Sequence, residues 1–330
     1  MALLRSDFTR LLQQQLVDIF WENYTEVGSV WRSLFTEQSI NTPYVERQSL
    51  LGMGDLVEKG ENEPFSYDQP TVGWPILGSV KSFGKAMAFS RELYDDSQFL
   101  NLFGESVAQI AQNYDRTRDR YYAQFLNYGA LTAGHRVFNA TVPGVIVDPT
   151  GDFIYDGKPL FAGTAQAHPS LMSDRTFANY DTLDLTLENI QKVYTKMTVD
   201  NAYDEQGNKI VISPDTIVVP QELELEALAL MNQEYIAQDA TTGIGGASAR
   251  RNPFYRKFRI IVWPHLTTAD GWFMIQRGYG LRALIRQQPE IEVWEDPETK
   301  QMRASVYCRF GAYADSWRHM FANNIPQAIA

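Results

Sequence analysis

The longest regular pattern of apolar and polar positions in this sequence runs from Asp96 to Gly129. Large apolar side chains recur there at spacings of three, four or seven residues, which predicts one stripe along a helix. The stripe consists of Phe99, Phe103, Val107, Ile110, Tyr114, Tyr121, Phe125 and Tyr128, and Thr117 fills its one gap. At about 1.5 Å per residue the helix is roughly 45 to 50 Å long, so it suits an extended molecule better than a compact enzyme.

Polar residues mark the start and the opposite face of this helix. Asp95, Asp96 and Ser97 offer side-chain acceptors to its first turn, and Gly129 is suited to the left-handed conformation just past its end. The opposite face is predicted to carry Gln112, Asp115, Arg116, Arg118, Asp119 and Arg120. One glycine, Gly104, interrupts the helical pattern between Phe103 and Glu105.

A long segment rich in glycine and proline lies between two strand-like runs. Tyr44 to Leu51 and Pro75 to Phe89 are predicted to pair as a two-stranded ribbon, and six Gly and three Pro lie between Ser49 and Gly84. A two-stranded ribbon is only marginally stable in water. We therefore expect residues 50–82 to project from the body and pack on a neighbouring copy, with Trp74 as an apolar contact. A mobile surface loop is the alternative.

The remaining patterns mix short helices with strands. Apolar spacing predicts an N-terminal helix from Asp7 to Asn23 and later helices over Thr186 to Met197 and after Pro220. Strands are predicted over Ile217 to Val219, Phe258 to Trp263, Trp272 to Gln276, Glu290 to Glu295 and Met302 to Phe310, the last two pairing with each other, and a turn over Asp204 to Asn208. Because helices and strands do not alternate regularly, the predicted fold class is α+β.

Charge and composition exclude several classes of protein. The 330 residues are 44% apolar and 21% charged, as in ordered globular proteins. The chain has 29 Lys and Arg against 40 Asp and Glu, and its net charge of −11 argues against a surface that grips phosphate backbones. Arg5, Asp7 and Arg10 interrupt any apolar leader, and no run approaches the ~20 apolar residues of a membrane span. We expect no membrane partner.

Residues that could bind a metal or act in catalysis are scattered and do not form a recognisable motif. The four histidines, His135, His168, His265 and His319, have no ligand spacing, so we expect neither a metal site nor a cofactor. Cys308, the one cysteine, lies on the inward side of a predicted strand, where core packing is favoured over nucleophilic chemistry. It also excludes an internal disulfide framework and fits a reducing compartment.

Two loops carry weaker signals. Gly243 to Gly246 superficially resembles a phosphate-binding loop but lacks the strand, helix and Lys-Ser/Thr pair of that motif. Asp148, Asp152 and Asp156 are four residues apart and could collect calcium, although turn capping explains them better. No pair of carboxylates is distinguished as acid and base, so no catalytic residue is predicted.

A basic cluster stands out in this acidic chain. Arg250, Arg251, Arg256, Lys257 and Arg259 occur within ten residues that contain no acid. The cluster is equally consistent with a contact patch for acidic groups of another copy and with a solvated loop.

Several segments in a fixed order resemble a known family of proteins. They are FGKAMAFSRELYDD (83–96), DGKPLFAGTAQAHP (156–169), SPDTIVVPQELELEALALM (213–231), IIVWPHLTTADGWF (260–273) and RFGAYADSWR (309–318). Together they resemble tailed-bacteriophage major capsid proteins of the Hong Kong 97-type fold, in a branch similar to the phage Mu head subunit. In the second segment Pro169 follows His168 where that branch has an Asn.

The resemblance implies a division into four parts. These are an N-terminal arm (1–43), an extended loop (44–89), a peripheral domain (90–182 and 288–330) built on a spine helix (96–129), and an axial domain (183–287). The implied function is self-assembly into hexamers and pentamers of an icosahedral shell around double-stranded DNA. Candidate assembly contacts are Lys59, Trp74, Arg250 and Arg251, and Gly104 is a candidate hinge in a helix that is bent in immature shells.

The resemblance also implies partners and leaves two alternatives. Portal, scaffolding and decoration proteins are expected partners, and packaged DNA is expected as a non-specific neighbour. The subunit is expected to assemble in the host cytoplasm and to reside in the virion. An encapsulin-like compartment is one alternative, and a soluble hydrolase that uses Asp and His, with one deep polar pocket, is the alternative of another class.

Overall fold

The computed structural model describes most of the chain. The described residues are 14–15, 18–22, 29–50, 58–65, 67, 72–90, 99–131, 154, 156–171, 173–236, 250–299 and 301–327. Residues 14–15 and 18–22, inside the predicted N-terminal helix, are helical.

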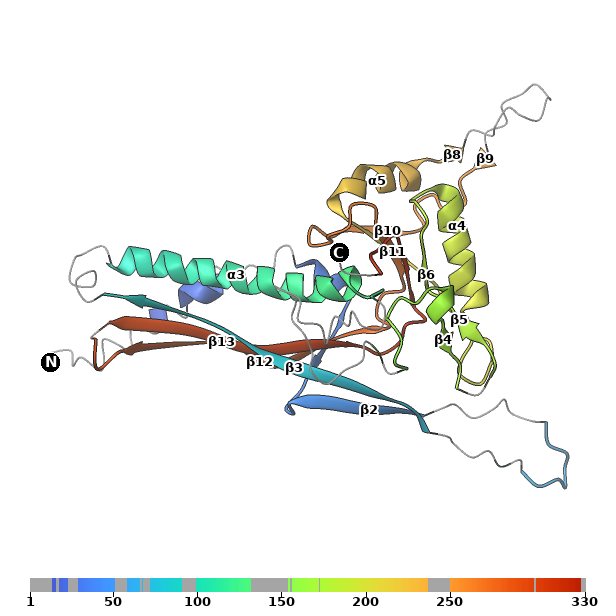
Figure 1. Cartoon of the computed structure of the whole chain (residues 1–330), viewed down its shortest axis with the longest axis horizontal. Helices are drawn as coiled ribbons and strands as arrows, with labels where there is room; N and C mark the ends of the chain where they lie inside the picture. The colour runs from blue at the N-terminus through green and yellow to red at the C-terminus, as the bar shows by residue number, and fades with distance from the viewer. Residues whose placement is uncertain are drawn as a thin grey trace.

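A five-stranded sheet with very long central strands forms one layer of the molecule. Its order is β1-β12-β13-β3-β2, and its strands are β1 (Thr36–Ser39), β2 (Tyr44–Leu50), β3 (Val72–Phe89), β12 (Leu281–Glu295) and β13 (Met302–Ala314). All neighbours are antiparallel except β1 and β12. Helix α3 (Phe99–Asn127) lies along the long strands (Figure 1). The predicted pairing of residues 290–295 with the following strand is confirmed. The predicted ribbon is confirmed for residues 44–50, which pair with residues 72–79, whereas residues 80–89 pair with β13.

A second five-stranded sheet lies at one end of the first. Its order is β10-β7-β11-β14-β6, and its strands are β6 (Tyr180–Asp181), β7 (Thr216–Val219), β10 (Arg259–Val262), β11 (Trp272–Ile275) and β14 (Met320–Asn323). Helices α4 (Leu187–Thr195) and α5 (Glu224–Asn232) lie around this sheet (Figure 1). Two small two-stranded sheets pair β4 (His168–Pro169) with β5 (Thr176–Phe177) and β8 (Tyr235–Ile236) with β9 (Arg250–Arg251). Four short helical segments are also described, η1 (Val30–Ser33), η2 (Thr164–Gln166), η3 (Lys196–Asp200) and η4 (Gln221–Leu223).

The predicted helices and turn of this region are confirmed, and the sheet adds a feature that local patterns did not predict. Thr186 caps α4 by accepting a hydrogen bond from the Asn189 backbone N–H. In the turn, the Asp204 N–H donates to the Asn208 carbonyl over 2.9 Å. Strand β7 is fully buried and lies between β10 and β11, pairing in parallel with one and antiparallel with the other. Strand β7, which is distant in sequence, therefore lies between two strands that are close to each other in sequence.

The spine helix differs from its prediction at its end and on its polar face. Residues 96–98 lie outside the described residues, and α3 ends at Asn127, two residues before Gly129. Gly129 does not have the predicted left-handed conformation. Its carbonyl accepts a hydrogen bond from the Phe161 N–H, and a Cβ at Gly129 would lie 2.6 Å from the Phe125 carbonyl oxygen, so glycine allows a close approach here.

Two residues predicted on the exposed face of the helix are in fact buried. Arg118 is 0% and Asp119 is 5% exposed. Asp119 accepts hydrogen bonds from the Trp31 backbone N–H (3.0 Å) and from the Trp263 indole (2.8 Å). The Arg118 guanidinium lies 4.7 Å from the ring centre of Trp31. The prediction was wrong because two segments distant in sequence, around Trp31 and Trp263, cover this side of α3.

The ribbon is shorter than predicted and its base is packed. Residues 80–89 of β3 pair with β13, so residues 80–82 belong to the sheet and do not project. Near the base, Ile40, Ile76, Leu284 and Tyr313 form a small buried cluster. A Cβ on Gly78 would lie 2.6 Å from the Tyr313 ring, so glycine allows this close approach. Beyond it, Figure 1 shows β2 and β3 leading away from the body at one corner of the molecule.

Candidate functional site

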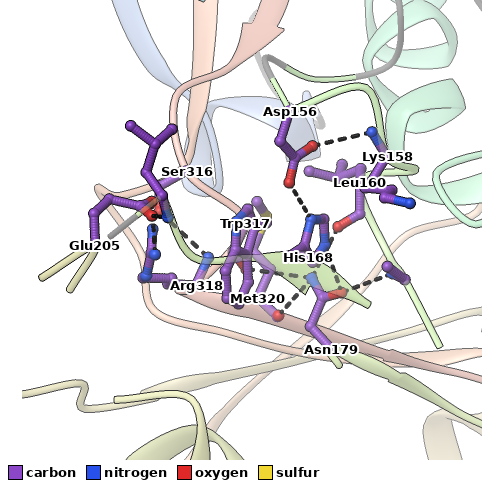
Figure 2. A network of polar contacts seen from close by, with 12 residues as sticks. Asp156, Lys158, Leu160, His168, Asn179, Glu205, Ser316, Trp317, Arg318 and Met320 are labelled. Carbon is purple, nitrogen blue, oxygen red and sulfur yellow. Dashed lines mark hydrogen bonds and ion pairs between the residues drawn. The ribbon is translucent and has the colours of Figure 1, made fainter. Parts of the chain in front are cut away.

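A buried network of polar side chains lies where the segment 156–169, strand β6 and the turn between β13 and β14 meet (Figure 2). The chain brings Asp156, His168 and Asn179 together from these segments, and the indole of Trp317 covers the histidine. Asp156, for which the sequence favours turn capping over calcium binding, accepts a hydrogen bond from the Lys158 N–H over 3.1 Å and is also the partner of His168. Asp148 and Asp152 lie outside the described residues.

Asn179 is the centre of this network. Its Oδ1 accepts a hydrogen bond from the Ala162 N–H over 2.7 Å, and its Nδ2 donates to the Leu160 carbonyl over 2.8 Å. The same Nδ2 lies 3.3 Å from the carbonyl oxygens of Trp317 and Met320. Asn179 is fully buried, so one amide satisfies backbone groups of two distant segments, 160–162 and 317–320.

His168 is held on both ring nitrogens and on one ring face. Its Nδ1 lies 2.7 Å from Asp156 Oδ2, and its Nε2 lies 3.2 Å from Asn179 Oδ1. Asn179 Oδ1 is an acceptor and is the hydrogen-bond partner of the ring Nε2, while the Asp156 carboxylate is the partner of Nδ1. The ring stacks on Trp317 with centroids 4.3 Å apart and planes 4° apart.

A carboxylate next to a histidine is also found in the catalytic triads of hydrolases, where the histidine relays a proton from the nucleophile to the leaving group. Such a relay needs a nucleophile within hydrogen-bond reach of the second ring nitrogen. Here that position is taken by the amide oxygen of Asn179, and the side chains of His168 and Asp156 are 0% and 1% exposed. The network therefore stabilises a junction of chain segments and offers no route for a substrate.

A second set of contacts fastens the turn at 204–208 to the same junction. The Arg318 Nη2 donates to Glu205 Oε1 over 2.7 Å, and its Nε donates to the Tyr203 carbonyl over 2.8 Å. The guanidinium also lies over the Trp317 ring at 4.6 Å from the centroid. Figure 2 shows Arg318 and Glu205 on one side of Trp317 and His168 on the other. This ion pair is largely shielded from solvent.

The other candidate residues for chemistry lie apart from the junction. His265 lies 3.8 Å from Asp119, whose burial raises the pKa of its carboxyl. Cys308 is buried in β13, and burial raises the pKa of its thiol to about 12, so core packing is confirmed. His135 and the loop Gly243 to Gly246 lie outside the described residues. Among the described residues, no group of three or more His, Cys, Asp or Glu has a geometry that could hold a metal.

The structure does not bring the candidate assembly contacts together. Trp74 is half-buried in β3, and the Lys59 ammonium lies 4.5 Å from the Phe65 ring centre near the ribbon tip. Arg251 in β9 is exposed and lies 3.9 Å from Glu234. The backbone of Arg250 pairs with Ile236. Figure 1 shows the ribbon and the β8–β9 hairpin at separate corners.

Gly104 lies within α3, near its start.

Where the chain is described, no helix combines the length and the apolar character that a membrane span requires.

Sequence reasoning missed the residues that organise the interior. Nothing in the local pattern distinguishes Asn179 from a surface asparagine, because its partners lie up to 141 residues away. One signal was available for it. The segment 156–169 resembles a family motif in which an Asn follows the His, and Asn179 brings an amide to His168 from another part of the chain.

Comparisons with known proteins give a consistent result. The model of a family described as phage capsid protein matches residues 75–323. Among solved structures, the chain is similar to that of Mycobacterium phage Patience, with 11% identity, a TM-score of 0.54 and coverage of 99% of this chain and 91% of that one. It is also similar to the capsid of an empty GTA particle computed with C5 symmetry, with 11% identity, a TM-score of 0.54 and 92% of each chain covered. A comparison with curated proteins gave no match.

We predict that Asn179→Ala destabilises the unassembled subunit by about 3 to 5 kcal/mol, because it leaves buried N–H and C=O groups without partners. Urea unfolding followed by tryptophan fluorescence measures the change. Asn189→Ala is the matched control, since the Asn189 amide donates one exposed hydrogen bond to the Asp184 carbonyl. Its cost should stay below about 1 kcal/mol. An equal loss in both variants would contradict the central role of Asn179.

The second prediction concerns pH and His319, which stacks on Tyr279 with centroids 4.7 Å apart. Burial lowers the pKa of His319 from 6.5 to about 4. The unfolded chain therefore takes up a proton that the folded chain excludes, and stability falls as the pH drops from 6.5 to about 4. The loss is at most about 3 kcal/mol.

His319→Phe keeps the aromatic stack and removes the titration. Unfolding free energies of both proteins between pH 7 and about 4.5 measure the effect. The variant should have the smaller slope. Identical slopes would show that His319 is not responsible.

Proposed function

Because this chain belongs to the phage capsid protein family and is a major capsid protein of a tailed-phage virion, we propose that it forms the hexamers and pentamers of an icosahedral shell around double-stranded DNA. The observation that carries the proposal is the family match over residues 75–323, which spans both sheets and the long helix. Neither the encapsulin-like compartment nor the soluble hydrolase is favoured by an observation. We infer that the chain has no catalytic activity.

The proposed parts of the subunit follow the family architecture. Residues 1–43 are the N-terminal arm, 44–89 the extended loop, 90–182 with 288–330 the peripheral domain, and 183–287 the axial domain. Strand β12 crosses one boundary, since it starts at Leu281 and continues to Glu295. Strand β14 of the peripheral domain pairs with β11 of the axial domain, and residues 80–89 of the extended loop pair with β13. The domains therefore share sheets, and we expect them to fold together.

The shape and charge of the subunit support assembly with itself. The ribbon exposes large apolar side chains near its tip, with Phe65 72% and Tyr67 91% exposed. A monomer gains nothing from such exposure, whereas a neighbouring copy can bury it. The net charge of −11 suits a wall that holds DNA as a non-specific neighbour, because tight binding would hinder packaging and release. Portal, scaffolding and decoration proteins are proposed partners, and the host cytoplasm is the proposed place of assembly.

The ribbon gives the first prediction from this proposal. Leu50 and Val72 are the outermost pair of β2 and β3, so residues 51–71 can be replaced by an Asn-Gly turn that closes the hairpin. The variant should keep the unfolding free energy of the wild type, since the sheet and its base cluster remain, but form few or no shells. Size-exclusion chromatography with negative-stain microscopy measures assembly.

A control separates the length of the ribbon from its side chains. Substituting residues 51–71 by a Gly/Ser segment of equal length keeps the reach of the loop and removes its contacts. We expect this protein to be as defective as the short variant. Normal shells from either variant would contradict the role proposed for the ribbon.

Gly104 gives the second prediction, on the proposal that it lets α3 bend in immature shells. Glycine in a helix costs roughly 0.8 to 1 kcal/mol relative to alanine, so Gly104→Ala stiffens the straight helix. The variant should yield a larger share of expanded particles, measured as particle diameter. Gln112→Ala, at an exposed position of the same helix, is the control. Unchanged diameters with a reduced yield of soluble subunit would show that Gly104 serves close packing.

A further inference from the structure

Charges of opposite sign are separated along the chain around α5. Between Lys209 and Arg250 the sequence has six acids and no Lys or Arg, and from Arg250 to Ala269 it has five Lys or Arg and no acid. Some residues of each group are described, lie on or next to this helix and have exposed side chains. One subunit therefore presents both an acidic and a basic surface in the same region.

The acidic surface is the outer face of α5 and of the short turn before it, formed by Glu222, Leu225, Glu226 and Leu228. All four side chains are exposed, and Leu225 is 80% exposed. The inner face of the same helix buries Ala227 and Met231. A helix with apolar residues on both faces is normally covered on both, so this outer face lacks a cover in the single subunit.

The basic surface is a turn formed by Arg256, Lys257 and Arg259, all exposed. It starts beside the C-terminal end of α5, where the Arg256 N–H donates to the Met231 carbonyl over 3.0 Å. Arg256 has a φ of 52°, a left-handed conformation that is unfavourable for a side chain of its kind. Such conformations cluster at binding sites, where the surrounding structure holds them in place. The Lys257 ammonium lies 3.8 Å from the ring centre of Tyr194, which positions it.

The two surfaces do not neutralise each other within the subunit. Glu222 and Glu226 lie toward the N-terminal end of the helix, whereas the basic turn lies at the other end, roughly 10 Å away along the axis. Among the residues that the structure describes, no ion pair involves Glu222, Glu226, Arg256 or Arg259. Each surface thus has charge available for a second molecule.

We propose that the acidic face of α5 in one copy binds the basic turn of the next copy around the ring of each capsomer. Two different surfaces on one chain produce a head-to-tail contact, and head-to-tail contacts form rings when the rotation from copy to copy closes, as it does in a hexamer or pentamer. Leu225 and Leu228 supply the apolar centre, and the charges supply orientation and choice of partner. The inference rests on the proposed shell function and names the surfaces that join its subunits.

Charge exchange tests the contact. Glu222→Lys with Glu226→Lys reverses one surface, and Arg256→Glu with Arg259→Glu reverses the other. Each double variant places like charges opposite each other and should lower the yield of capsomers and shells by about tenfold or more. The quadruple variant restores opposite charges and should recover most of the yield. Glu188→Lys with Lys192→Glu, which exchanges an ion pair on α4 that lies within one subunit, is the matched control and should assemble normally.

The readouts are the mass of soluble species by size-exclusion chromatography with light scattering, and shells by microscopy. Melting curves of the unassembled variants identify folding defects. If the reversed proteins misfold, the test is the dissociation of wild-type capsomers at increasing NaCl concentration. Capsomers joined by exposed ion pairs should dissociate as the NaCl concentration rises.

Three results would overturn the proposal. The first is that the reversed variants assemble like the wild type. The second is that the quadruple variant folds but recovers no yield. The third applies if the reversed variants misfold, and it is that wild-type capsomers do not dissociate as the NaCl concentration rises. A wild-type chain that remains monomeric would overturn the proposed function as well, so the two failures are distinguishable.

Discussion

One buried carboxylate joins the three regions on which the subunit is built. Asp119, on the long helix, accepts hydrogen bonds from the backbone of Trp31 and the indole of Trp263, which belong to the N-terminal region and to the segment after β10. Burial raises the pKa of this carboxyl, so its ionised form is costly to enclose. The two donors offset that cost only when all three segments are in place. The carboxylate therefore favours a single docking position for the helix against the N-terminal region and the segment after β10.

The subunit joins its interior segments through buried polar contacts, but it leaves large apolar side chains exposed at its edges. Asn179 and the His168–Asp156 pair supply partners to backbone groups where the two sheets meet. The ribbon tip and the outer face of α5, in contrast, expose apolar residues such as Tyr67 and Leu225. In a shell many identical contacts act at once, so each can be weak while the assembly is stable. An interior that is rigid and a periphery that is incomplete are the properties such a subunit needs.

The polar junction also shows why a pair of suggestive side chains is not a site. Asp156 and His168 are 2.7 Å apart, as in a catalytic relay, but burial and the amide of Asn179 assign them to structure. The fold accounts for this placement. The His168 ring stacks on Trp317. Trp317 lies in the connection from β13 to β14, where the chain passes from the long sheet to the second sheet.

The sequence by itself determined the elements whose signal is local. The stripe along α3, the helix that begins after Thr186, the turn at 204–208 and the alternation in β13 all follow from backbone periodicity or from short-range hydrogen bonds, and all are present in the structure. The α+β class follows from the order of these elements. The resemblance to capsid proteins came from segments that keep their order along the chain.

Only the tertiary structure decided what depends on distant partners. Asp119 reads as a surface residue within its helix, and residues 88 and 144 positions away bury it. Strand β7 separates β10 from β11, and residues 80–82 join the long sheet instead of the ribbon, because strand pairing is set across the whole chain. The partners of Asn179 and the separation of charge around α5 likewise become visible only when the chain is folded. Local patterns specify faces and turns, but burial depends on which remote segment covers each face.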